Sequence, residues 1–163
     1  MGETGTVHSI NTSGGGVPKL PRPEASITAD GLSGDRQRDR RHHGGPMRAV
    51  SLYSLERIRA LQAEGHPVGV GTMGENVTVA GLDWSRVGPG VRLAIGDVLL
   101  EVTEDAPPCK TIAGSFRDGG FTRASQKVHP GWSRFYARVL REGSVRVGDP
   151  VALVGVAPEG ASS

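Results

Sequence analysis

Cysteine is nearly absent from this sequence of 163 residues, because Cys109 is the single one. One thiol excludes an intramolecular disulfide and any site that needs several thiolates, such as a four-cysteine zinc or iron–sulfur centre. Two prolines, Pro107 and Pro108, precede Cys109, end an apolar run and hold the cysteine in a rigid turn. Any sulfur chemistry therefore falls to Cys109, and a buried, inert thiol is the alternative interpretation.

Long apolar runs and net charge are also scarce. No run approaches the roughly 20 residues that span a bilayer, and the N-terminus lacks the basic start and apolar stretch of a secretory signal. Nineteen Lys and Arg against seventeen Asp and Glu leave a formal net charge of +2. Such a balance gives no electrostatic footprint for nucleic acid. We therefore expect a cytoplasmic protein with neither nucleic-acid nor membrane partners.

Glycine and proline, in contrast, are abundant, with 25 and 11 residues. Turn signals such as Gly88-Pro89-Gly90 separate short apolar runs, and this pattern is typical of strands in a barrel or sandwich. A parallel α/β sheet would need a helix between most strands, which the sequence does not offer. We expect strands at residues 49–53, 76–82, 91–95, 98–103 and 150–154.

One stretch has helical periodicity, where Leu55, Ile58 and Leu61 recur at steps of three. Ser54 can cap the N-terminus of this helix, and Gly65 can adopt the left-handed conformation that ends it. The sequence thus predicts a mainly β protein, a barrel with one well-defined helix and a few short helices.

The chain is expected to form a single barrel domain over residues 1–155, followed by a flexible tail at residues 156–163. The N-terminus and the loop at residues 13–23 are the other candidates for disorder. Short helices are expected near Lys110 and Trp132.

Three segments carry polar groups that suit a ligand. Residues 31–46 gather four arginines and two histidines before a double glycine, and arginine donors with glycine N–H groups suit a phosphate. The alternative is a solvated, charge-interleaved loop. Residues 125–151 mix aromatic and cationic groups, among them Trp132, Arg134 and Tyr136, which either line a binding site or pack in the core.

The third segment places Gly74, Glu75 and Asn76 directly before an alternating strand. A glycine there allows close backbone approach to a ligand, and Asn76 offers a donor and an acceptor for a heterocycle edge. The alternative is a turn in which Asn76 bonds its own backbone. The five histidines show no metal-ligand spacing.

Taken in order, several motifs resemble those of the MOSC family, which is related to the C-terminal part of molybdenum cofactor sulfurase. These motifs are GLSGD, HHGGP with AVSLYS, MGENVTVAGLD, IGD and the Pro-Pro-Cys at Cys109. The segment SQKVHPGWSRFYARVL is similar to that of the small standalone bacterial members. The resemblance runs from about Val7 to Val154, nearly the whole chain.

The resemblance implies a MOSC-type β-barrel that holds molybdenum cofactor, with Cys109 as metal ligand or sulfur carrier. A thiolate is a soft, deprotonated ligand, which suits a sulfur-rich metal centre. At the level of the family alone, pyridoxal phosphate binding is also associated with this domain. By analogy the cofactor site takes Gly74, Glu75 and Asn76, with Arg36, His43, Gly44 and Gly45 as candidates for phosphate or pterin contacts.

The resemblance also implies a reaction, the reduction of N-hydroxylated substrates, with electrons from a separate reductase. Larger reductase-like members often carry an arginine two residues before the Pro-Cys pair, where this chain has Ala106. The sequence therefore leaves the enzymatic role open. One alternative is a carrier that holds the cofactor, or a Cys109 persulfide made by a cysteine desulfurase; another is a barrel that binds neither. The oligomeric state is also open.

Overall fold

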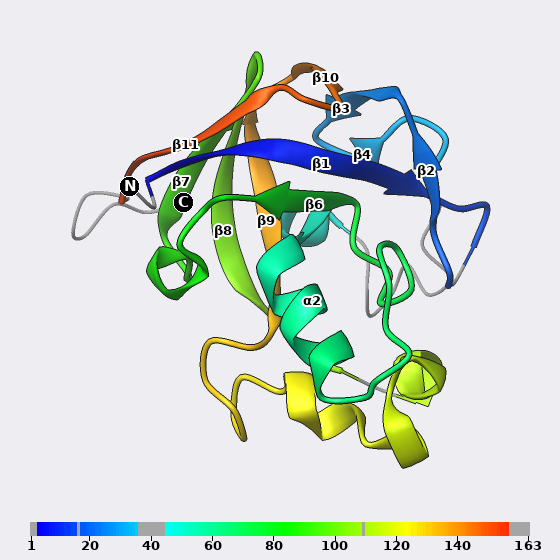
Figure 1. Ribbon diagram of the computed structural model, residues 1–163. Coiled ribbons are helices and arrows are strands. Elements are labelled where there is room, and N and C mark those ends of the chain that lie inside the picture. Colours follow the sequence, from blue (N-terminus) through cyan, green and yellow to red (C-terminus); the bar gives the residue numbers. More distant parts are fainter. Residues whose placement is uncertain (1–2, 16, 36–44, 109, 157–163) are drawn as a thin grey trace.

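The computed structural model describes residues 3–15, 17–35, 45–108 and 110–156 (Figure 1). Within these residues, seven strands close a β-barrel. In order around the barrel they are β1 (Thr4–Thr12), β11 (Pro150–Val156), β7 (Val91–Ile95), β8 (Val98–Ala106), β9 (Arg134–Arg141), β5 (Val50–Ser54) and β6 (Val77–Ala80). The barrel closes where β1 pairs with β11 on one side and with β6 on the other. The predicted mainly β barrel is confirmed.

Four short strands lie outside the barrel wall. Strand β2 (Leu20–Arg22) pairs with the end of β1. The others, β3 (Glu24–Thr28), β4 (Gly31–Leu32) and β10 (Gly143–Arg146), form a separate sheet, which Figure 1 shows beside β2. Together β2 to β4 bring the segment that precedes residue 36 to one end of β1.

Strands β5 and β6 are the parallel pair of the barrel, and all its other pairings are antiparallel. Parallel neighbours need a crossover connection, which here contains α2 (Leu55–Ala63). The register places Leu52 opposite Val77, so Ser51 and Asn76, one residue before each, also lie close together.

Helix α2 packs its apolar face against the outside of the barrel, where it contacts β5 and β6 (Figure 1). Leu55, Ile58 and Leu61 are buried, as their spacing predicts. The hydroxyl oxygen of Ser54 accepts from the Arg57 amide at 3.2 Å, and Gly65 has a φ of 95°. The predicted helix, its cap and its stop are all confirmed.

The short 3₁₀ helices are η1 (Pro46–Arg48), η2 (Trp84–Arg86), η3 (Lys110–Ser115), η4 (Arg117–Gly119) and η5 (Phe121–Ala124). Helix η3 confirms the expectation near Lys110. The expectation near Trp132 is wrong, because Pro130 disfavours helical conformation before it and Gly131 has a φ of 89°. No helix in the described part of the chain is long and apolar enough to cross a bilayer.

The expected disorder near the N-terminus is also wrong, since β1 begins at Thr4 and is among the longest strands. Strand β8 continues to Ala106, three residues beyond its predicted end, and so delivers the chain directly to Pro107 and Pro108. Of the tail expected at residues 156–163, Val156 still belongs to β11, and the rest lies outside the described residues.

Candidate functional site

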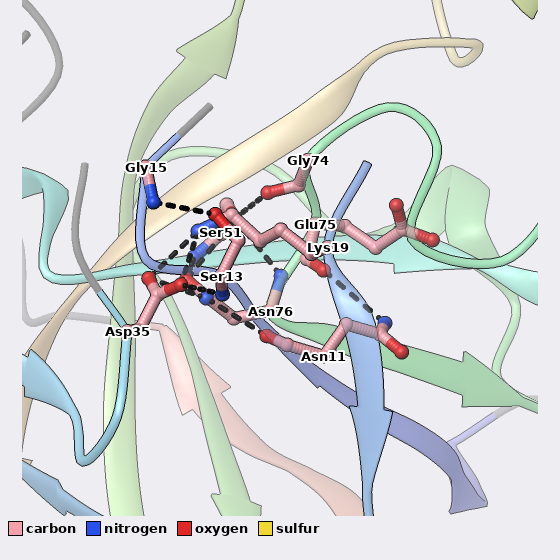
Figure 2. Close-up of polar contacts among 9 residues, drawn as sticks. All are labelled: Asn11, Ser13, Gly15, Lys19, Asp35, Ser51, Gly74, Glu75 and Asn76. Atoms are coloured by element: carbon pink, nitrogen blue, oxygen red, sulfur yellow. Dashed lines mark hydrogen bonds and ion pairs between the residues drawn. The ribbon is translucent and has the colours of Figure 1, made fainter. Parts of the chain in front are cut away.

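Asn76 is the centre of a buried polar network (Figure 2). Its side-chain oxygen Oδ1 accepts from the amide of Ser51 at 3.0 Å and from the Ser51 hydroxyl at 3.2 Å. Its nitrogen Nδ2 donates to Asp35 Oδ2 at 2.9 Å and to the carbonyl oxygen of Asn11 at 3.3 Å. All four hydrogen-bonding positions of this amide are therefore filled by the protein itself.

Asp35 ties this network to the segment around Lys19. The ammonium of Lys19 donates to both carboxylate oxygens of Asp35, at 2.8 and 2.7 Å, and the amide of Ser13 donates to Oδ1 at 3.0 Å. Both side chains of the pair are over nine-tenths buried. The ion pair is thus enclosed, and the two charges compensate each other.

Glu75 is fully buried, and Figure 2 shows its side chain directed away from Asp35. Its Oε2 accepts from the amide of Gly71 at 3.1 Å and from the hydroxyl of Thr78 at 3.0 Å, while Oε1 has no partner among the described residues. Burial raises the pKa of this carboxyl, although these hydrogen bonds and the charge of Arg134 act in the opposite direction. The folded protein therefore holds the proton of Glu75 more tightly than an exposed carboxyl would.

Gly74 has a φ of 86°, a conformation that favours glycine. Its carbonyl oxygen accepts from the Ser51 hydroxyl at 3.0 Å, which fixes the turn before β6. A Cβ at this position would lie 3.1 Å from Val17 Cγ1 and 3.8 Å from Nη1 of Arg134. The backbone here is closely approached by a guanidinium from another strand.

That guanidinium belongs to Arg134 at the start of β9, a residue whose exposed fraction is 7%. Its Nη2 donates to the carbonyl oxygen of Ala106 at 3.5 Å, and Ala106 is its register partner on β8. Its Nε is buried and has no acceptor among the described residues. Arg134 thus lies between Gly74 and the end of β8, the strand that leads through two prolines to Cys109.

The structure brings together some of the predicted site residues. Gly74, Glu75 and Asn76 form one buried turn, whereas Gly45 lies at the start of η1 with a φ of 93° and accepts from the amide of Arg48. The other predicted site residues lie outside the described residues; they are Arg36, His43, Gly44 and Cys109. The described residues contain no group of three His, Cys, Asp or Glu side chains that could hold a metal ion.

Sequence reasoning missed the Lys19 and Asp35 pair and gave Arg134 no specific role. The sequence offers only a weak signal for Arg134, because the same strand carries two further arginines, Arg138 and Arg141. Nearby in sequence, Trp132 makes cation–π contacts. The guanidinium carbons of Arg57 and Arg123 lie 4.7 and 3.9 Å from its ring centroid, which favours a packing role for this side chain.

A family model described as the MOSC domain matches residues 39–152. The chain belongs to the MOSC domain family. The YflK protein of Bacillus subtilis is 32% identical over 150 residues, which are 90% of this chain and 66% of YflK. A protein of Gibberella moniliformis named reductase is 32% identical over 133 residues, which are 78% of this chain and 23% of that protein.

The MOSC fold is also found in the crystal structure of YiiM from Geobacillus stearothermophilus. That structure matches with a TM-score of 0.72 and 25% identity, over 93% of this chain and 75% of the YiiM chain. The present MOSC chain spans about two thirds of YflK and less than a quarter of the reductase. Similarity to these proteins therefore identifies the domain. It does not by itself assign the activity of a whole relative to this chain.

Proposed function

We propose that this MOSC protein binds molybdenum cofactor and reduces N-hydroxylated substrates, with Cys109 as the molybdenum ligand. Membership of a family that is generally associated with this cofactor supports the proposal, as does the reductase among its relatives. The structural observation that carries it is the meeting of Gly74 and Ala106 around Arg134. The turn that bears Asn76 and the end of β8 therefore lie on either side of Arg134.

The residues present fit a group of this kind. Molybdenum cofactor is a pterin that carries a phosphate, so a site for it needs cationic donors that have no other partner. The Nε of Arg134 is a buried donor without an acceptor among the described residues. Gly74 carries no side chain, and Val17 and Arg134 lie near the place that a Cβ would occupy.

Each side chain then has a distinct task. The thiolate of Cys109 would bind the metal, since thiolates are suitable soft ligands. Asn76 has no free position and would instead hold the Gly74 turn in place. Glu75 would hold its proton more tightly than an exposed carboxyl does, because burial raises its pKa. Contacts to the pterin or its phosphate would come from Gly74 and from the predicted set of Arg36, His43, Gly44 and Gly45.

The bound cofactor supplies two-electron chemistry that removes oxygen from an N–O bond. For a hydroxylamine-type group the balance is R₂N–OH plus two electrons and two protons, giving R₂N–H and water. The chain has one cysteine and so cannot build an iron–sulfur electron donor by itself. In this proposal a separate reductase delivers the electrons.

An activity assay tests this proposal. The protein is produced in a host that makes molybdenum cofactor, and a chemically reduced viologen serves as electron donor to an N-hydroxylated nucleobase. We expect wild-type protein to form the reduced base, and Cys109→Ser to lose this activity while keeping its fold. An equally active Cys109→Ser variant would contradict the proposal.

A second experiment tests the alternative function, in which this protein carries sulfur and does not reduce N-hydroxylated substrates. Incubation with a cysteine desulfurase and cysteine, followed by mass spectrometry, shows whether Cys109 acquires a persulfide. A persulfide on a protein that reduces no N-hydroxylated compound would assign this chain to sulfur delivery.

A further inference from the structure

Arg134 is distinguished from every other buried charged side chain that the structure describes. The others are Lys19, Asp35, Glu75 and Glu101. Lys19 is paired with Asp35, and Glu101 is paired with Arg92 at 3.0 Å and with Arg138 at 2.8 Å. Glu75 makes no ion pair among the described residues; burial raises the pKa of its carboxyl, and the charge of Arg134 acts in the opposite direction. Charged side chains are rarely buried unless they are paired.

Arg134 makes no ion pair among the described residues, although its charge acts on the buried carboxyl of Glu75. Its one hydrogen bond there is the long contact from Nη2 to the carbonyl oxygen of Ala106, at 3.5 Å, and its Nε has no acceptor. Its guanidinium is permanently charged. A charge that is buried, positive and unpaired in this way is suited to an anionic ligand that brings the missing negative charge.

The surroundings of Arg134 favour a small, planar or tetrahedral oxyanion. Gly74, whose position has no side chain, lies on one side, and the end of β8 at Ala106 lies on the other. Lys19, which also lies near Gly74, has its charge paired with Asp35 through two bonds, whereas Arg134 has no ion pair among the described residues. Guanidinium groups bind carboxylates and phosphates through parallel N–H donors.

We propose that Arg134 is an oxyanion-binding residue, which takes a phosphate or carboxylate group beside Gly74 and the end of β8. This proposal rests on the unpaired charge and its position, and it does not require the redox activity proposed above. The same oxyanion can come from the phosphate of a bound pterin or from an acidic group on the substrate.

Calorimetric titration of the full-length protein with inorganic phosphate, and separately with acetate, tests the proposal at constant ionic strength. We expect saturable binding of at least one of the two anions at one site per chain. Arg134→Gln should weaken that binding by about 10- to 100-fold, the usual effect of losing charge-assisted hydrogen bonds. Absence of binding to wild-type protein, or equal binding to Arg134→Gln, would overturn the proposal.

The matched control is Arg138→Gln, on the same strand, because Arg138 already has a carboxylate partner in Glu101. It should leave anion binding unchanged, and an equal loss of binding in this variant would overturn the proposal. If Arg134→Gln does not fold, Arg134→Lys keeps the positive charge but not the two-pronged geometry. Weaker phosphate or acetate binding by a folded Arg134→Lys supports the proposal, and unchanged binding contradicts it.

Thermal stability separates ligand binding from a purely structural role. An unpaired buried charge costs stability, so Arg134→Gln should not lower the Tm of the anion-free protein. The bound anion should raise the Tm of the wild type and leave that of Arg134→Gln unchanged. A lower Tm for anion-free Arg134→Gln, with no anion effect on the wild type, would make Arg134 a packing residue and contradict the proposal.

The pterin content of protein made in a host that produces molybdenum cofactor identifies the source of the oxyanion. Pterin content lost in Arg134→Gln assigns the group to the cofactor phosphate. Retained pterin together with lost anion binding assigns it to the substrate. Failure of the proposed reductase activity would leave the titration result unaffected, so the two proposals fail separately.

Discussion

At the residue scale, the buried turn before β6 and the adjoining Arg134 on β9 include side chains whose polar atoms all have partners and side chains whose polar atoms do not. Asn76 fills its four hydrogen-bonding positions internally, whereas Arg134 and Glu75 each retain a buried polar atom without a partner among the described residues. Satisfied groups fix a structure, and unsatisfied buried groups are places where a ligand or proton can be accommodated. By this criterion Asn76 is a positioning residue, whereas Arg134 and Glu75 are candidates for binding a ligand or a proton.

Asn76→Ala should strongly destabilise the protein. The change leaves the amide of Ser51 and the carbonyl oxygen of Asn11 with fewer partners, and removes a donor from Asp35. Each buried polar group left unpaired costs about 1–3 kcal/mol, so we expect a loss of about 3 kcal/mol in the free energy of unfolding in urea. The exposed Arg86→Ala variant, which breaks an ion pair with Glu3, should change it by less than about 1 kcal/mol. A loss for Asn76→Ala as small as that of the control would contradict this role.

Glu75→Gln should stabilise the protein in a way that depends on pH. Since the pKa of Glu75 is raised in the folded state, the folded protein holds this proton more tightly, and stability falls as pH rises from the usual carboxyl range through the raised pKa. Gln carries no charge and keeps an acceptor for Gly71 and Thr78. We expect a gain on the order of 1 kcal/mol or more at pH 8 that vanishes near pH 4.

Urea unfolding at several pH values measures this difference, with Glu3→Gln as an exposed control. A change in unfolding free energy for Glu75→Gln that has the same size and sign at every pH would show that burial does not shift the pKa of the Glu75 carboxyl.

The sequence could identify the turn at Gly74, Glu75 and Asn76, because glycine and asparagine before an alternating strand are a local signal. It could not identify the pairing of Lys19 with Asp35, since the two residues are far apart in sequence and meet only through β2 to β4. Arg134 was named only as one of several polar residues. Its importance depends on the absence of a partner, which a sequence does not reveal.

At the element scale, β1 shows why the sequence under-predicts strands. Ser9, Asn11 and Thr12 are buried in this strand, and their polar side chains hide the apolar alternation by which strands are recognised. Ser9 and Asn11 belong to the polar network, for example through the bond from Ser9 Oγ to Asn11 Oδ1 at 2.6 Å. The strands β5, β7 and β11 have apolar patterns and were predicted nearly at their observed bounds.

Glu101 links three strands, since it lies on β8 and bonds Arg92 on β7 and Arg138 on β9. Burial of this carboxyl opposes its charge, but the hydrogen bonds from the two arginines hold its pKa below the usual value. Glu101→Gln should therefore cost about 1–3 kcal/mol of unfolding free energy at pH 7. This cost should shrink as pH falls through the lowered pKa, where the wild type loses the same charge.

Glu104→Gln is the control on the same strand, because Glu104 pairs with Arg48 at a more exposed place. Urea unfolding should show a change of no more than about 1 kcal/mol for this variant. Equal effects for the two variants, or a Glu101→Gln cost independent of pH, would contradict the cross-strand role.

At the scale of the whole molecule, closure by β1 and β11 joins the two ends of the described chain. The register from Thr4 opposite Ala152 to Thr6 opposite Pro150 completes the ring. Closed barrels leave no sheet edges unpaired. The sequence could predict a barrel from its turn spacing, but not which strands close it, because closure is a contact between distant segments.

A chain that ends at Gly148 tests this closure. It lacks β11, leaves β1 and β7 with unpaired edges, and exposes core residues that Val151 covers. We expect loss of cooperative thermal unfolding by circular dichroism and an aggregation-prone product. A chain that ends at Val156 retains every described strand and should melt cooperatively. A cooperative transition with unchanged Tm in the shorter chain would contradict the role of β11.

The most direct test of cofactor binding through Cys109 is the molybdenum and pterin content of the protein, made in a host that produces the cofactor. Metal analysis and fluorescence of the oxidised pterin are compared between wild type and Cys109→Ser. We predict near-stoichiometric molybdenum and pterin in the wild type and little molybdenum in the variant. Wild-type protein without either component, or a Cys109→Ser variant with the same molybdenum content, would contradict the assignment.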